Sequence, residues 1–158
     1  MSIVYDEPTA SDLEFYQAAL DEAKAGLSTG GIPIGAVLVC DNKVIGRGHN
    51  KRVQLGSTIR HGETDCLENA GRLSAETYAR CTLYTTLSPC AMCSGTCLLY
   101  KIPRIVVGEN VNFQGEEGWL ASRGTKLCLL KDEETTTMMK TFIENNDTLW
   151  NEDIGEVN

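Results

Sequence analysis

Two short segments contain the residue types that bind zinc and activate water. His61 and Glu63 lie in the first segment, and Cys90 and Cys93 lie in the second. One imidazole and two thiolates leave a tetrahedral zinc ion with an open fourth position, as in catalytic rather than structural sites. A zinc-bound water beside a carboxylate that is not a ligand suits hydrolysis. The two segments therefore predict a hydrolytic zinc centre with Glu63 as a carboxylate that is not a ligand.

The spacing also predicts where these side chains lie in their helices. Cys90 and Cys93 are three residues apart, so they point the same way from the first turn of one helix. The preceding Ser88-Pro89 suits a helix start, and a helix N-terminus favours the thiolate that zinc needs. His61 and Glu63 are two residues apart and would face apart inside a helix. We therefore expect His61 at or just before its helix begins.

Two other interpretations of these residues stay open at this point. A closed structural zinc site needs a fourth ligand, for which His49 and Cys97 are the candidates. It would make the chain a non-catalytic, zinc-stabilised interaction module. A Cys-x-x-Cys redox pair is the other interpretation, but it does not require the His-x-Glu segment upstream.

The pattern of apolar residues predicts alternating helices and strands. Ser11 to Glu14 form a capping-box motif, which predicts a helix from there to about Leu27. We expect strands at 34–40, 43–48, 82–86, 104–107 and 126–130, helices at 61–72, 90–100 and 132–145, loops at 51–60 and 111–124, a turn at 41–42 and a short terminal segment at 149–155. This order predicts an α/β fold of three layers, α/β/α, with a mixed five-stranded sheet in a single domain, 1–158.

Composition narrows the class of protein further. The net charge of −8 favours a small neutral substrate over nucleic acid, which needs a basic surface. Seven cysteines cannot all pair in disulfides, which argues against a disulfide-stabilised fold. We therefore expect a reducing compartment, namely the cytoplasm or also the nucleus. The five outside the Cys-x-x-Cys pair are expected in the core: Cys40, Cys66, Cys81, Cys97 and Cys128. No apolar run approaches the roughly 20 residues of a membrane helix.

Motifs along nearly the whole chain point to one family. They are Gly31–Gly35, Gly46–Asn50, His61–Glu63, Thr82–Cys93, Val107–Phe113, and Trp150 with Glu152–Glu156. The chain resembles the cytidine-deaminase superfamily, and most closely the fungal cytosine deaminases that act on the free base. The resemblance implies one zinc ion, a homodimer, and hydrolysis of cytosine to uracil and ammonia in pyrimidine salvage. The same superfamily includes tRNA adenosine deaminases and guanine deaminases, which remain the alternatives.

The resemblance also implies individual roles. His61, Cys90 and Cys93 bind zinc, and Glu63 transfers the proton. Around the base, Asn50 pairs with the ring edge, Phe113 and Trp150 sandwich the ring, Asp153 accepts from the amino group, and Gly62 and Ser88 are further contacts. By residue type alone, Asn50 could equally be a turn residue and Asp153 a solvated charge. Trp119 carries no such role, and Asn151 stands where the fungal enzymes tend to have an aromatic residue.

Overall fold

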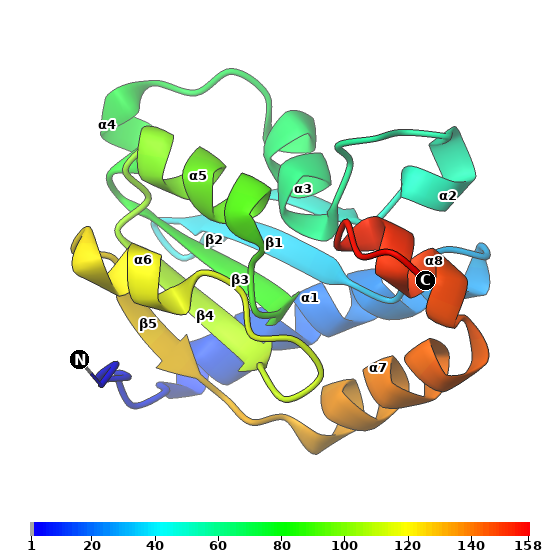
Figure 1. Cartoon of the computed structure of the whole chain (residues 1–158). Helices are drawn as coiled ribbons and strands as arrows, with labels where there is room; N and C mark the ends of the chain where they lie inside the picture. Colours follow the sequence, from blue (N-terminus) through cyan, green and yellow to red (C-terminus); the bar gives the residue numbers. More distant parts are fainter. Residues whose placement is uncertain (1) are drawn as a thin grey trace.

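The computed structural model describes residues 2–158 and has a five-stranded sheet covered by helices on both faces (Figure 1). The elements in chain order are α1 (Ala10–Ser28), β1 (Gly35–Cys40), β2 (Lys43–His49), α2 (Arg52–Leu55), α3 (Gly62–Ala70), α4 (Ala75–Tyr78), β3 (Cys81–Leu87), α5 (Ala91–Leu99), β4 (Arg104–Glu109), α6 (Glu117–Ser122), β5 (Lys126–Leu129), α7 (Glu133–Asn145) and α8 (Asp147–Asp153). The predicted α/β/α architecture with a mixed sheet is confirmed.

The sheet combines one hairpin with three parallel strands. Its strand order is β2-β1-β3-β4-β5; β1 pairs antiparallel with β2 and β3, whereas β3, β4 and β5 run parallel. The turn between β1 and β2 consists of Asp41 and Asn42, whose φ angles are 51° and 62°. Two left-handed residues match the twist of a tight hairpin, and Asp and Asn tolerate that conformation. The predicted turn is confirmed.

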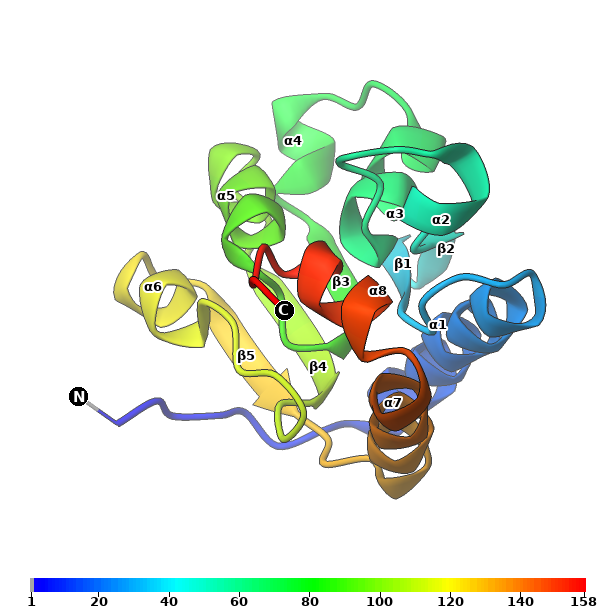
Figure 2. The ribbon, with the colours of Figure 1, turned by 45° about the vertical axis from the view of Figure 1, so that its right-hand side comes forward.

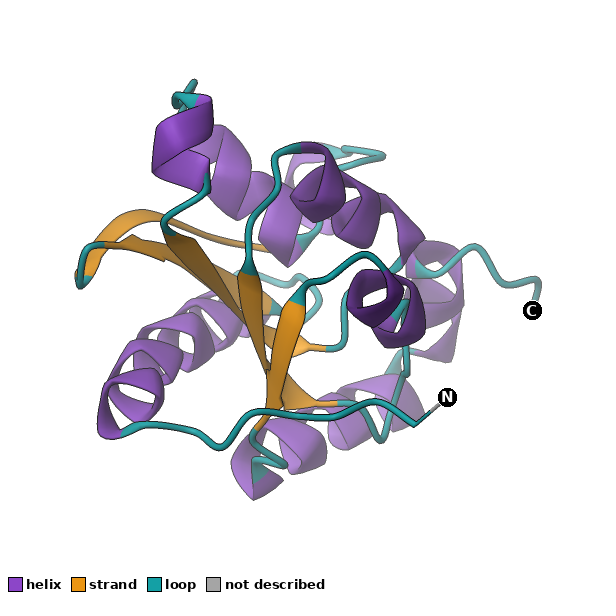
Figure 3. Ribbon diagram, turned by 90° about the vertical axis from the view of Figure 1, so that its left-hand side faces the viewer, coloured by secondary structure: helices purple, strands orange, loops and turns teal. Residues whose placement is uncertain are grey.

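Both faces of the sheet are buried, which explains the continuous apolar sequence of β1. Ala36 and Leu38 join the core beneath α3 and α5, whereas Val37 and Val39 join the core against α1. Successive side chains of a strand point to opposite faces, so a strand between two helical layers needs apolar residues at every position. Figure 3 shows the sheet between these two layers.

A third apolar cluster covers one end of the sheet. Trp150 of α8 packs there with Met139 and Phe142 of α7, and with Ile34 and Leu87 beside the strand ends. Figure 2 shows α8 above α7, on the side of the molecule where α3 and α5 begin. The predicted short terminal segment is therefore a helix held against the body of the molecule.

The structure differs from the sequence-based prediction in several short elements. The first helix begins earlier: Thr9, not Ser11, is the N-cap, and Asp12 completes the capping box. The predicted loop at 51–60 includes α2, and the predicted loop at 111–124 includes α6. The unassigned stretch before β3 includes α4. These helices have four to six residues, too few to show a helical repeat of apolar positions.

The cysteines outside the Cys-x-x-Cys pair lie where they were predicted. Cys40, Cys66, Cys81, Cys97 and Cys128 are all buried, and all five are free thiols. They act as small apolar residues of the core. Within residues 2–158, no helix combines the length and hydropathy needed to cross a membrane.

Candidate active site

The zinc-type ligands lie at the beginnings of two helices. His61 is the N-cap of α3, with extended backbone angles (φ −70°, ψ 171°), and Cys90 is the N-cap of α5 (φ −69°, ψ 177°). Cys93 follows in the first turn of α5. An extended N-cap frees His61 from helical geometry, so it and Glu63 can face one site. The predicted position of His61 at the helix start is confirmed.

The spacing of the ligand atoms fits a tetrahedral zinc ion. His61 Nδ1 lies 3.4 Å from Cys90 Sγ and 3.8 Å from Cys93 Sγ, and all three atoms lie within 4.8 Å of one another. Bonds of about 2.0–2.3 Å at tetrahedral angles place such atoms about 3.5–3.8 Å apart. Within residues 2–158 no fourth ligand joins this cluster. Cys97 is buried in the core and His49 hydrogen-bonds to Glu22, so neither closes the site.

Glu63 lies beside the ligand atoms in an environment that favours its proton-bound form. Its side chain is buried, with 4% of the residue exposed, and burial raises the pKa of the carboxyl to about 7. The hydrogen bond with Cys93 lowers the pKa of the Cys90 thiol to about 4, although burial opposes this shift. A carboxyl that titrates near neutral pH can both accept and return a proton.

Asp153 links the C-terminal helix to both the histidine and Asn50. Asn50 Nδ2 donates to both Asp153 oxygens, at 3.1 and 3.2 Å, and Arg52 Nη1 donates to Oδ1 at 3.3 Å. His61 Nε2 lies 3.6 Å from Asp153 Oδ2. A carboxylate there favours the imidazole orientation in which Nδ1 faces the thiols. Asp153 is therefore a buried, paired group rather than a solvated charge.

A small cavity joins most of the predicted site residues. Its volume is about 20 Å³, and its walls include His61, Glu63, Ser88, Phe113, Trp150 and Asp153. This is room for about one water molecule. The rings of Phe113 and Trp150 meet edge to face, with centroids 5.9 Å apart and an interplanar angle of 83°. Phe113 and Trp150 therefore contact each other at the wall of this cavity.

Two predicted site residues do not line this cavity. Asn50 is fully buried behind Asp153, and its Oδ1 accepts from the Arg52 backbone N–H at 3.0 Å. Gly62 lies against Ile34, whose carbonyl oxygen would be 3.0 Å from a Cβ at position 62. Close packing alone therefore favours glycine there. Contacts of Asn50 and Gly62 with a base stay predictions.

Two buried carboxylates that the sequence did not single out hold the turns around the site. Glu117 accepts from the hydroxyl groups of Ser88 and Tyr5, the latter at 2.6 Å. Ser88 Oγ in turn accepts from the Gly115 N–H at 2.9 Å. A Cβ at Gly115 would lie 1.9 Å from the Pro89 carbonyl oxygen, so this approach requires glycine. Glu117 thus fixes the turn that presents Cys90.

Glu109 fixes the loop that includes Phe113. Its Oε2 accepts from the backbone N–H groups of Val111 and Asn112, at 2.7 and 3.0 Å. Its Oε1 accepts from Asn112 Nδ2 at 2.8 Å. The partners of Glu109 lie two and three residues further along the chain. An acidic residue at a strand end before Asn-Val-Asn could therefore have predicted this loop-fixing role from the sequence. Ser88 and Tyr5, which donate to Glu117, are remote from it in sequence, and no local pattern predicts these contacts.

Comparison with known proteins identifies the class to which this site belongs. Residues 9–109 match the family model described as the cytidine and deoxycytidylate deaminase zinc-binding region. The chain belongs to this family of zinc-dependent deaminases. The family description and the cluster of His61, Cys90 and Cys93 together assign one zinc ion per chain.

Individual relatives narrow the similarity further. The chain is 52% identical to the cytosine deaminase of Candida albicans over 149 residues, which cover 94% of this chain and 99% of that one. It is 39% identical to the tRNA-specific adenosine deaminase of Streptococcus pyogenes over 105 residues, covering 65% and 66% of the two chains. Among solved structures, the guanine deaminase of Bacillus subtilis superposes with a TM-score of 0.56 at 26% identity, covering 72% of this chain and 70% of that one.

Proposed function

We propose that this chain catalyses the hydrolytic deamination of free cytosine to uracil and ammonia. The similarity to a cytosine deaminase over nearly the whole of both chains carries this proposal. The tRNA-specific relatives match only about two thirds of the chain. The cavity supports a small substrate, because α8 and the loop with Phe113 close it around the predicted zinc ligands.

The residues around the cavity supply the proton transfers and the contacts to the base. His61, Cys90 and Cys93 would hold the zinc ion, which would supply a Lewis acid that lowers the pKa of water toward about 7. Glu63 accepts one proton from the attacking water and delivers it to N3 of the ring. The hydroxyl then bonded to C4 gives its remaining proton through Glu63 to the amine, so that the C4–N bond breaks, ammonia leaves and C4 becomes a carbonyl. Each of these transfers requires a buried carboxyl within reach of the reacting atoms.

The remaining groups recognise cytosine and exclude water. Asp153 accepts a hydrogen bond from the C4 amino group, which uracil lacks, and Asn50 pairs with the O2 and N1 edge. Phe113 and Trp150 cover the two faces of the ring, with Gly62 and Ser88 as further contacts. A pyrimidine is larger than a cavity of about 20 Å³, so we expect the aromatic pair to separate when the base binds.

An ammonia-release assay tests this function against its alternatives. The zinc-loaded protein is incubated separately with cytosine, cytidine, adenine, guanine and tRNA. We expect release from cytosine. Release from tRNA alone would favour an adenosine deaminase, which the 39% identical relatives make the second candidate. Release from guanine alone would favour a guanine deaminase. A zinc-loaded protein that releases no ammonia from any of them would contradict catalysis and favour an interaction module.

We also propose that the chain forms a homodimer through the face of α3, α4 and α5. This face has a hollow of about 800 Å³ with Ile59, Leu67, Leu73, Tyr78 and Tyr100 among its lining residues, and it contains none of the zinc ligands. Leu99 beside it is 69% exposed. Most of the rest of the lining is polar or charged, but the exposed apolar side chains of Ile59, Leu99 and Tyr100 on this face suit contact with a second copy of the chain.

Salvage of pyrimidine bases in the cytoplasm is the proposed cellular setting. The proposed reaction converts a free base into another free base, as salvage of pyrimidines requires. All seven cysteines are free thiols, which suits a reducing compartment.

A further inference from the structure

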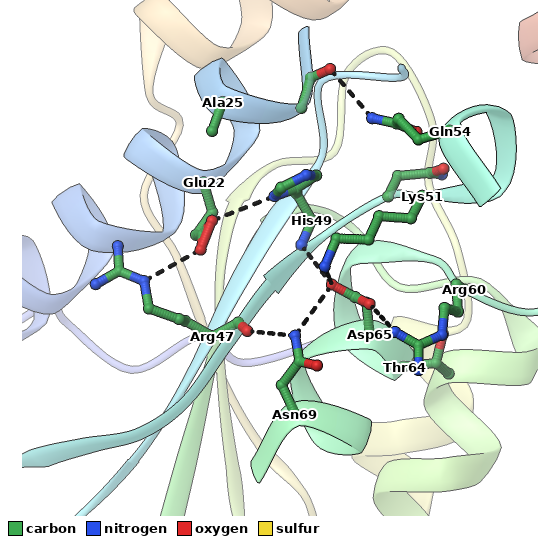
Figure 4. A network of polar contacts seen from close by, with 12 residues as sticks. Glu22, Ala25, Arg47, His49, Lys51, Gln54, Arg60, Thr64, Asp65 and Asn69 are labelled. Atoms are coloured by element: carbon green, nitrogen blue, oxygen red, sulfur yellow. Dashed lines mark hydrogen bonds and ion pairs between the residues drawn. The ribbon is translucent and has the colours of Figure 1, made fainter. Parts of the chain in front are cut away.

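Asp65 is a fully buried carboxylate on α3 that does not line the active-site cavity. Its side chain has 0% exposure and lies at the centre of the network in Figure 4. Oδ2 accepts from the His49 backbone N–H at 3.1 Å and from Asn69 Nδ2 at 3.3 Å, and it pairs with Lys51 Nζ at 3.0 Å. Oδ1 accepts from Arg60 Nη1 at 2.6 Å. A buried charge with this many partners fixes the segments that supply them.

These partners lie on both sides of a segment that leads into the site. His49 ends β2, Lys51 begins the connection to α3, and Arg60 ends that connection immediately before the zinc ligand His61. The backbone supports the same closure, because Lys51 N–H donates to the Arg60 carbonyl oxygen at 2.9 Å. One carboxylate therefore joins the end of a strand and both ends of the following loop to the helix of Glu63.

Asn50 lies between two of the groups that Asp65 binds. The backbone of His49 and the side chain of Lys51 both contact Oδ2, so this one oxygen holds the residues on either side of Asn50. Asn50 N–H itself donates to the Ile34 carbonyl oxygen at 2.9 Å. The close approach of the Asp65 carboxylate to the end of β2 needs glycine at position 48, because a Cβ there would lie 2.4 Å from Asp65 Oδ2. The Asn50 side chain consequently projects toward Asp153 from an anchored backbone.

We propose that Asp65 is a positioning residue, which holds Asn50 in register with the zinc-ligand helix so that its amide can pair with the substrate ring. This inference rests on the proposed function, in which Asn50 contacts the base. Every group that meets the Asp65 carboxylate is a hydrogen-bond donor. An asparagine at position 65 must therefore point its own NH₂ group at another donor, although it fills the same volume.

The first test is the steady-state kinetics of Asp65→Asn with cytosine. A ring-edge contact acts in both the ground state and the transition state, so loosening Asn50 raises KM more than it lowers kcat. We expect KM to rise about tenfold, the loss expected for one weakened buried hydrogen bond, with kcat within about twofold of the original. Zinc content should stay at one ion per chain. Lys51→Met, which removes only one partner, should raise KM by a smaller factor.

A double-mutant cycle separates positioning from a general loss of structure. If Asp65 acts through Asn50, Asp65→Asn has no further effect on kcat/KM in an Asn50→Ala background. The matched control is Asp12→Asn, since Asp12 is also a buried carboxylate with a hydrogen-bonded arginine, Arg104. It should lower the melting temperature while leaving KM unchanged. Fold-changes of Asp65→Asn and Asn50→Ala that multiply would overturn the positioning role.

Amide hydrogen exchange tests the same role without any substrate. In the zinc-loaded Asp65→Asn protein, exchange at Asn50 and Lys51 should be about tenfold faster, and the Asp12→Asn control should leave it unchanged. Unchanged exchange at these amides would refute the proposal whatever the reaction is. A chain that fails to turn over cytosine but shows the faster exchange would contradict the proposed function alone.

Discussion

Glu63 and the three zinc ligands lie within one small site, and we expect them to have different chemical tasks. His61 Nδ1 and the two sulfur atoms are arranged at distances that suit one metal ion. Glu63 stands outside that cluster and is enclosed by protein, which raises its pKa to about 7. The division predicts that zinc binding and proton transfer can be separated by single substitutions.

Glu63→Gln is expected to abolish most turnover while preserving the metal. The amide has nearly the same size but cannot carry the proton, and a positioned proton carrier contributes about 10²–10⁴-fold to rate. Cytosine turnover should fall by that factor, and metal analysis should still find one zinc ion per chain. His61→Ala is the contrasting variant, since it should lose the metal together with the activity. Full turnover by a zinc-loaded Glu63→Gln protein would assign the proton transfer elsewhere.

At the scale of elements, the start of α1 shows where sequence patterns stop being decisive. Both Thr9 to Asp12 and Ser11 to Glu14 fit the capping-box pattern. The structure uses the first, because Arg104, 92 residues further on, reaches Asp12 with two hydrogen bonds of 2.7 and 2.8 Å. Tyr84 adds a third at 2.8 Å. No local pattern contains this information.

The two capping interpretations make different predictions for stability. Asp12→Asn should lower the free energy of unfolding by about 2–4 kcal/mol at pH 7, because it leaves a partly buried arginine without its partner. Glu14→Gln on the exposed side of the same helix should change it by less than about 0.5 kcal/mol. Urea unfolding of both variants measures the difference. A larger loss of unfolding free energy in Glu14→Gln than in Asp12→Asn would instead support the capping box of Ser11 to Glu14.

The contribution of Asp12 to the free energy of unfolding should also depend on pH, and it should fall as the pH is lowered. Burial favours the protonated carboxyl, but the hydrogen bonds from Arg104, Thr9 and Tyr84 outweigh it and hold the pKa of Asp12 well below its usual range. The unfolded chain binds the proton near pH 3.9, before the folded chain does. The difference in free energy of unfolding between the original protein and Asp12→Asn should therefore be constant above about pH 5 and shrink progressively below pH 4. A difference that persists unchanged at pH 2.5 would contradict this linkage.

Sequence patterns located the main strands, the long helices and the zinc ligands, since each depends on residues close together in the chain. They missed α2, α4 and α6 and the roles of Asp65 and Glu117. Those carboxylates act through partners such as Lys51 for Asp65 and Tyr5 for Glu117, and the latter pair is 112 residues apart. Arg60 and Asn69 lie close to Asp65 in sequence, but only tertiary packing brings Tyr5 to Glu117. A buried acidic residue is recognisable only once its cations and donors are placed around it.

At the scale of the whole molecule, the fold gathers residues from distant parts of the chain at one edge of the sheet. Asn50 follows β2, Cys90 follows β3, and Phe113 follows β4, while Asp153 arrives on α8. In open α/β sheets, sites lie beyond the carboxyl ends of parallel strands, and β3 and β4 end here. The hollow on the face of α3, α4 and α5 shares no lining residue with the active-site cavity.

Leu99→Glu tests whether that face joins two copies of the chain. Leu99 is 69% exposed in the single chain, so a glutamate there should leave the fold intact but place a charge in the apolar contact. Sedimentation should give the original protein about twice its 17.3 kDa chain mass and the variant one chain mass. Val4→Glu is the control, because Val4 is 86% exposed and lies outside the hollow. The Val4→Glu protein should remain dimeric. A monomeric original protein, or a variant that still dimerises, would show that this face does not form the dimer.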